Sequence, residues 1–241
     1  MELNSVELAL KEIYDGWQLG NECENNGYSA MFRMGFPDEY IDSDRPLLMY
    51  VGQECLHGNK EKTQQWIRDY QIVQRTKTFN SEINEGTRNS PFWNFYRRLC
   101  DDGYNVLWNN LDKFHPENKQ RLSWEQGIRF NSPYGEDKLS VLQREIKELK
   151  PKVVVLVVGN KKYTASLASA FSVSEEELKK YEPNTTRYLS EISSVLGLEN
   201  VSVLWTYHPA YLQRKKLYCA VLQAIKEHFA IEKRSRKEDS L

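Results

Sequence analysis

The 241-residue sequence has almost no net charge, only four cysteines and no long hydrophobic run. Lysine and arginine number 33, against 34 for aspartate and glutamate, so the formal net charge is −1. This balance excludes a protein that coats nucleic acid through bulk positive charge. The longest apolar stretch, residues 153–158, is far shorter than the ~20 residues that cross a bilayer. The N-terminal segment carries acidic residues and does not resemble a signal peptide, so we expect a soluble, cytoplasmic protein with no membrane partner.

The cysteines are too scattered to hold a metal. Cys23, Cys55, Cys100 and Cys219 include no C-x-x-C pair, whereas structural zinc sites and iron–sulfur clusters usually show closer pairing. We therefore expect free thiols in a reducing cytosol, and no metal or other cofactor.

Four short apolar segments predict the strands of a parallel sheet. They are residues 47–51, 106–108, 153–158 and 201–205. Most of them are continuous rather than alternating, which is typical of strands buried on both faces. The intervals show helical spacing, for example at residues 6–19, 139–149 and 212–229. Since strand and helix alternate, we expect a three-layer α/β/α fold around a central four-stranded parallel sheet.

The length favours one domain, which we expect to comprise residues 1–230. Residues 231–241 are charged and have little to bury, so they are expected to form a frayed tail. Residues 71–89 show no clear period, and a long loop of this kind is either functional or disordered.

Polar residues and glycines come directly after the predicted strands. In an open parallel sheet, ligands bind beyond the carboxyl ends of the strands, so these side chains would face one crevice. Each also has a structural explanation, because glycine and asparagine form turns, a histidine often packs in a core, and a glutamate can sit on a solvated rim. In chain order they are Gly52, Gln53, Glu54, Asn109, Asn110, Gly159 and His208.

Three of these residue types suit one reaction. A carboxylate can orient or activate water, and a neutral histidine can donate a hydrogen bond to charge on a leaving group. An asparagine amide can read both a donor and an acceptor on a base edge. Together they meet the needs of hydrolysis of an N-glycosidic bond to a pyrimidine that has been flipped out of the stack.

Four segments, in order, resemble the motifs of the uracil-DNA glycosylase superfamily over about residues 45–230. The family has Gly-Gln-Asp-Pro-Tyr-His after its first strand, Leu-Leu-Asn at its second, a Lys-Pro before a strand that ends in Gly, and a final His-Pro-Ser-Pro-Leu. The matching segments are Gly52-Gln53-Glu54-Cys55-Leu56-His57, Leu107-Trp108-Asn109, Lys150-Pro151 with the strand that ends at Gly159, and His208-Pro209-Ala210-Tyr211-Leu212.

The resemblance implies a role for each matching residue. Glu54 would activate water and His208 would stabilise the leaving base, as the catalytic residues. Asn109 would read the base, with Asn110 as the alternative, and Leu212 would be wedged into the duplex. Three further residues are expected to contact the base: Gln53, His57 and Phe92. The alternative for Phe92 is a position in the core. Arg214, Lys215 and Lys216 are expected to contact phosphates.

Departures from the family pattern leave two functions open. Glu54 is one methylene longer than the family's Asp, and Cys55-Leu56 replaces the Pro-Tyr whose tyrosine helps to exclude thymine. We expect a divergent DNA glycosylase that acts on a damaged or modified base, with uracil as the default. The alternative is an inactive module that binds a nucleobase, a nucleotide or single- or double-stranded DNA. A serine hydrolase is disfavoured because residues 52–60 contain no serine.

Overall fold

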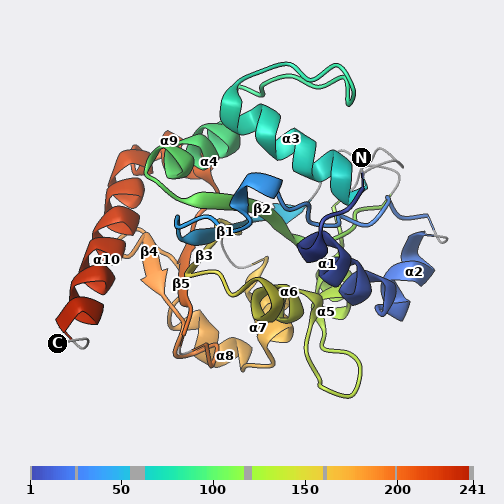
Figure 1. Cartoon of the computed structure of the whole chain (residues 1–241). Coiled ribbons are helices and arrows are strands. Elements are labelled where there is room, and N and C mark those ends of the chain that lie inside the picture. The colour runs from blue at the N-terminus through green and yellow to red at the C-terminus, as the bar shows by residue number, and fades with distance from the viewer. Residues whose placement is uncertain are drawn as a thin grey trace.

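The computed structural model of the protein describes residues 2–24, 27–54, 63–116, 121–159, 162–198 and 200–238. A central sheet carries helices on both faces (Figure 1). In chain order the elements are α1 (Ser5–Asp15), α2 (Gln18–Glu24), the 3-10 turn η1 (Asp38–Tyr40), β1 (Leu47–Glu54), α3 (Gln64–Thr76), α4 (Pro91–Asp101), β2 (Asn105–Asp112), α5 (Trp124–Asn131), α6 (Val141–Leu149), β3 (Val153–Leu156), α7 (Thr164–Phe171), α8 (Glu175–Lys179), β4 (Leu189–Glu191), β5 (Ser202–Thr206), α9 (Pro209–Arg214) and α10 (Tyr218–Glu238).

The sheet has five strands in the order β2-β1-β3-β5-β4. The four strands predicted from sequence, β1, β2, β3 and β5, run parallel to one another. The expected four-stranded sheet is extended by β4, which pairs with β5 in the antiparallel direction. This strand has only three residues, too few to show a period in the sequence.

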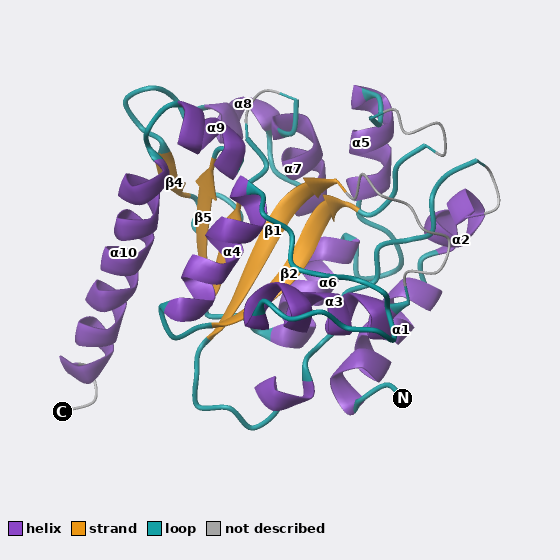
Figure 2. Ribbon diagram, turned by 90° about the horizontal axis from the view of Figure 1, so that it is seen from above, coloured by secondary structure: helices purple, strands orange, loops and turns teal. Residues whose placement is uncertain are grey.

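The helices form two layers, one on each face of the sheet. Helices α3, α4 and α9 lie over one face, and α6, α7 and α8 lie over the other (Figure 1). Seen from above, α3 and α4 cross in front of β1 and β2 (Figure 2). The expected three-layer α/β/α arrangement is therefore confirmed. None of the helices in the described residues is both long and apolar enough to cross a membrane.

Some predicted helices are divided in the structure. The prediction for residues 6–19 becomes α1 and α2, which separate at Gly16. The prediction for residues 212–229 becomes α9 and α10, and Lys216 between them has a φ of 60° that no helix accommodates. The helix α10 continues to Glu238, so part of the segment expected as a frayed tail is helical. By contrast, the helix predicted at residues 139–149 is the single helix α6, which begins at Val141 after the N-cap Ser140 and ends at Leu149 as predicted.

The buried face of helix α3 mixes polar and apolar side chains. The helix includes residues 71–76 of the segment expected to form a long loop, and both Gln71 and Gln74 are buried. The side chain of Gln71 donates to Gly35 O at 2.9 Å and accepts from the backbone N–H of Trp108 at 2.6 Å. Buried polar groups are tolerated when they are hydrogen-bonded in this way, and here they share the buried face with Ile67, Tyr70 and Val73, which lie at three-residue spacing.

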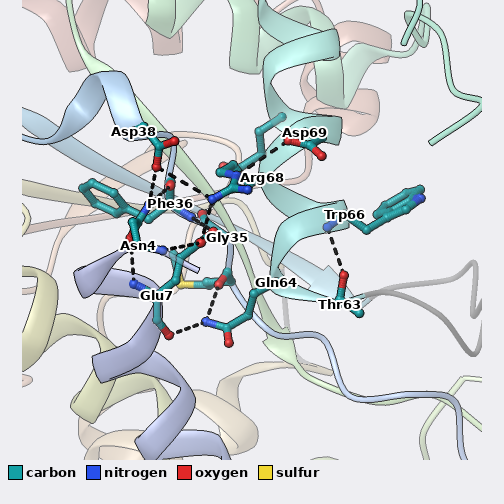
Figure 3. Close-up of polar contacts among 12 residues, drawn as sticks. Asn4, Glu7, Gly35, Phe36, Asp38, Thr63, Gln64, Trp66, Arg68 and Asp69 are labelled. Atoms are coloured by element: carbon teal, nitrogen blue, oxygen red, sulfur yellow. Dashed lines mark hydrogen bonds and ion pairs between the residues drawn. The ribbon is translucent and has the colours of Figure 1, made fainter. Parts of the chain in front are cut away.

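A buried polar cluster fastens α1 to α3 (Figure 3). The carboxylate of Glu7 accepts from the Arg68 guanidinium at 2.8 Å and from the backbone N–H of Phe36 at 3.0 Å. The Gln64 amide donates to Glu7 O at 2.9 Å. Gly35 lies so close to α3 that an added Cβ would be 2.3 Å from Arg68 N. These contacts hold the N-terminal segment against the helical layer that also carries α4.

Candidate functional site

Two consecutive asparagines near the end of β2 point to opposite faces of the sheet. Residues 109 and 110 were expected to follow the second strand, but β2 continues to Asp112 and includes both. In the parallel ladder, Asn109 pairs with Val51 and Asn110 with Gly52. Because successive side chains in a strand alternate between faces, the two amides enter different environments.

Asn109 belongs to a buried cluster on the face covered by α6. Its Nδ2 donates to Glu145 Oε2 at 2.8 Å, and its Oδ1 accepts from Lys113 Nζ. Glu145 also accepts from Lys113 at 2.7 Å and from the Tyr14 hydroxyl at 2.6 Å. Burial lowers the pKa of Lys113, and the Glu145 carboxylate opposes that shift. Asn109 is fully buried and its amide is bonded at both ends, so in this structure it presents no free group to a base, and its role as the base-reading residue stays a prediction.

Asn110 lies on the opposite face, beside α4. Its Oδ1 accepts from the indole N–H of Trp108 at 3.3 Å. A Cβ added to Gly52 would lie 2.7 Å from that oxygen and 2.9 Å from the Phe92 ring, so glycine is needed here for close packing. The Asn110 Nδ2 is buried and has no hydrogen-bond partner within the described ranges. A buried donor without a partner costs about 1–3 kcal/mol, so this nitrogen is a candidate for a hydrogen bond to a ligand.

His208 is held neutral and in one tautomer at the start of α9. Burial, aided by the positive charges of Arg121 and Arg214, lowers its pKa from 6.5 to about 4. Its Nδ1 accepts from the backbone N–H of Ala210 at 3.2 Å, so in the neutral ring the proton is on Nε2. The ring lies almost parallel to that of Phe92, with centroids 5.8 Å apart and an interplanar angle of 19°. His208 thus offers one N–H donor on the side of the sheet where Asn110 and Phe92 lie.

The first motif is only partly described. Gln53 donates through Nε2 to Val158 O at 3.0 Å, which ties β1 to the end of the third parallel strand. The backbone of Glu54 pairs with Asp112. The side chain of Glu54, together with His57 and the two residues between them, lies outside the described residues.

The residues expected to contact DNA at α9 differ in their exposure to solvent. Leu212 is fully buried, and its helical neighbour Pro209 is buried as well, so Leu212 does not project as a wedge. The three-residue spacing of Pro209 and Leu212 places both side chains on the buried side of α9. Arg214, Lys215 and Lys216 are exposed, as phosphate contacts require.

A groove of about 870 Å³ lies between α4 and the α9–α10 junction. Pro91 and Asn94, which flank Phe92 in α4, form part of its wall. Among its lining side chains, four are cationic and Asp101 is the one carboxylate. The cationic residues are Lys77, Arg97, Arg98 and Lys216. The groove is therefore basic although the chain as a whole has a net charge of −1.

Three residues connected to these side chains received no role of their own from the sequence. Trp108 is two positions before Asn110, and this spacing places both on one face of β2. Asp112 is a buried carboxylate that accepts from Asn131 at 2.8 Å and pairs along the backbone with Glu54. The positive charge of Arg121 contributes to the lowered pKa of His208. Within the described residues no group of three or more His, Cys, Asp or Glu side chains could hold a metal ion.

The fold and the site together define a class of protein. It is a three-layer α/β protein in which an aromatic ring (Phe92), an amide (Asn110) and a neutral histidine (His208) lie on one side of a mainly parallel sheet. The model of the Uracil DNA glycosylase superfamily matches residues 59–230. Because this is more than half of the chain, the protein belongs to that superfamily. The match begins after residues 52–57, which carry the altered first motif. A search of curated proteins gave no match. Membership supports a DNA glycosylase-like function and a nucleic-acid partner in general terms.

Proposed function

We propose that the protein is a DNA glycosylase that hydrolyses the N-glycosidic bond of a flipped, damaged or modified base, with uracil as the default. The observation that carries the proposal is the neutral His208 beside Phe92, on the same face as the unpartnered Asn110 Nδ2. A flipped base needs an aromatic surface and hydrogen bonds to its edge, and these residues are of the types that supply them.

His208 would act on the leaving base. As the bond to the sugar breaks, negative charge develops on the base, and a neutral N–H donor stabilises that charge. The fixed Nδ1 acceptor contact with Ala210 leaves Nε2–H as the donor. A histidine with a pKa of about 4 remains neutral throughout the physiological range, so no change of protonation is needed before the reaction.

The water-activating role of Glu54 rests on the resemblance of the first motif. Its backbone lies at the end of β1, next to the end of β2, which is the edge of the sheet where a flipped base would arrive. A carboxylate there would orient water toward the oxocarbenium-like sugar, on the face opposite to the departing base. Asn110 would contact the base edge, and Phe92 would lie against its ring.

DNA contacts are proposed along the basic groove. Lys216 lines it directly, and Arg214 and Lys215 are exposed on the neighbouring turn. Neutralising phosphates with such side chains releases counterions and gives salt-dependent affinity. Pro91 and Asn94, which line the groove, lie next to Phe92 in helix α4, so a strand bound in the groove would pass near the proposed base site.

The first test is product formation from defined oligonucleotides. Excess enzyme is incubated with strands that contain uracil, hypoxanthine or an alkylated base, and abasic sites are counted after alkaline cleavage. We expect product from at least one of them, and His208→Ala and Glu54→Ala each to lower the rate by about 10²-fold or more. The absence of abasic product from all of these substrates would refute the proposed glycosylase activity.

An inactive binding module is the second candidate. It is favoured by one observation, that the family match starts beyond the segment that carries Glu54. It predicts that bases or DNA raise the melting temperature without any abasic product. If wild-type protein forms product, this alternative is excluded.

A further inference from the structure

The indole of Trp108 determines which way the Asn110 amide points. The two residues share one face of β2, and the Trp108 Nε1–H donates to Asn110 Oδ1 at 3.3 Å. An indole nitrogen can only donate a hydrogen bond. The amide oxygen must therefore face Trp108, and the Nδ2 group is turned toward its unpartnered position.

Trp108 is itself held in place. Its backbone N–H donates to the buried Gln71 side chain at 2.6 Å. Its ring packs against Phe32, Trp93 and Tyr70, with centroid distances of 4.7, 4.8 and 5.8 Å. Because these contacts fix the indole, a rotated Asn110 amide would place its NH₂ group against the indole N–H and lose the hydrogen bond.

We propose that Trp108 is a positioning residue that sets base specificity through Asn110. With the amide locked, the site presents an N–H donor to the base, so it accepts a carbonyl oxygen and rejects an exocyclic amino group at that point. The substrate class is then a keto base, such as uracil or hypoxanthine, rather than cytosine or adenine. This inference rests on the proposed function, and it assigns a role to a residue that the sequence motif contains but leaves without one.

The fixed orientation of the Asn110 amide is what makes the site discriminate strictly between keto and amino bases. An asparagine amide that is not held by a neighbour can rotate by about 180° and offer either its oxygen or its NH₂ group to a ligand. Removing the indole N–H leaves both orientations accessible, and an amino base could then be bound through Oδ1. Loss of selectivity, rather than general loss of binding, is thus the signature of this role.

The test compares the binding of free uracil and free cytosine by NMR titration of the full chain. We expect wild-type protein to prefer uracil by about tenfold or more, the worth of one hydrogen bond to a buried group. Trp108→Phe, which keeps an aromatic ring but lacks the donor, is expected to bind the two bases about equally. Trp93→Phe removes an indole from the same aromatic cluster and is expected to keep the wild-type preference.

Each outcome bears on either the inference or the proposed function. A preference for uracil that survives in Trp108→Phe overturns the role of Trp108, and so does the absence of any preference, or of any binding, in wild-type protein. The same preparations are assayed for cleavage of a uracil-containing strand. If wild-type protein shows the base preference, and Trp108→Phe loses it, without any cleavage, the inference holds and the proposed glycosylase fails.

Discussion

The two faces of β2 carry neighbouring asparagines whose side-chain amides differ in their hydrogen bonding. On the α6 face, Asn109 is bonded through both amide atoms to Glu145 and Lys113. On the α4 face, Asn110 is bonded through its oxygen alone, and its buried nitrogen is left without a partner among the described residues. One residue type, at adjacent positions of one strand, therefore contributes to stability on one side and to the candidate site on the other.

This difference shows how to separate structural from functional polar residues at a sheet edge. A structural polar group is buried and fully bonded, because an unpaired one destabilises the fold. A functional group can retain an unused donor or acceptor until a ligand arrives. The account predicts that changes on the α6 face alter stability and that changes on the α4 face alter base recognition.

The largest expected effect is on the α6 face. Lys113→Met leaves the buried Glu145 carboxylate without its cation, and breaking a buried pair in this way costs about 3–5 kcal/mol of unfolding free energy. Chemical denaturation measures this. The matched control is Lys11→Met, which removes a lysine from the exposed pair with Asp15, and this should cost less than about 1 kcal/mol. Equal losses in the two variants would contradict the structural role of the α6 face.

The next effect concerns pH and His208. Its folded-state pKa of about 4 is below the ordinary 6.5, so protonation favours the unfolded chain. The stability from a neutral His208 is complete above pH 6.5 and is lost as the pH falls toward 4. Between pH 7 and 4.5 this amounts to about 2–3 kcal/mol.

The His208→Asn variant isolates that contribution, because asparagine keeps an N-cap acceptor but does not titrate in this range. Denaturation curves at the two pH values should show the smaller acid loss in the variant. An identical loss in variant and wild type would mean that His208 is not held neutral by the fold.

The smallest effect concerns DNA affinity on the α4 side. Arg98→Glu combined with Lys216→Glu reverses two charges of the groove. We expect DNA binding to weaken by about tenfold or more and its salt dependence to become less steep, as measured by fluorescence anisotropy over a range of salt concentrations. Lys147→Glu, on the exposed side of α6, serves as the control and should change affinity less. Equal weakening by both changes would place the DNA elsewhere.

Much of the fold could be predicted from the sequence. The apolar run of β3 and the segment of β5 are buried along their whole length, so their composition reports their position directly. His208 and Phe92 were expected to meet, and their rings do lie together. Each of these two residues follows a clear boundary signal in the sequence. His208 comes after the end of a strand, and Phe92 comes after Ser90-Pro91, which begins a helix.

The rest depended on contacts that no local pattern records. Choosing between Asn109 and Asn110 requires the strand register, because a shift of one residue exchanges the faces. Leu212 has the motif position of a wedge, but the turn of α9 buries it. The buried glutamines of α3 are satisfied by distant backbone groups such as Gly35 O, so only the tertiary structure explains them.

The most direct test of the account is the single-turnover rate of abasic-site formation from a uracil-containing strand, measured for Asn109→Ala and Asn110→Ala at a temperature where both are folded. The account predicts that Asn110→Ala lowers the rate by about 10²–10³-fold, as expected for a lost hydrogen bond to developing charge, and that Asn109→Ala stays within about tenfold of wild type. A full rate in Asn110→Ala with a lost rate in Asn109→Ala would contradict it.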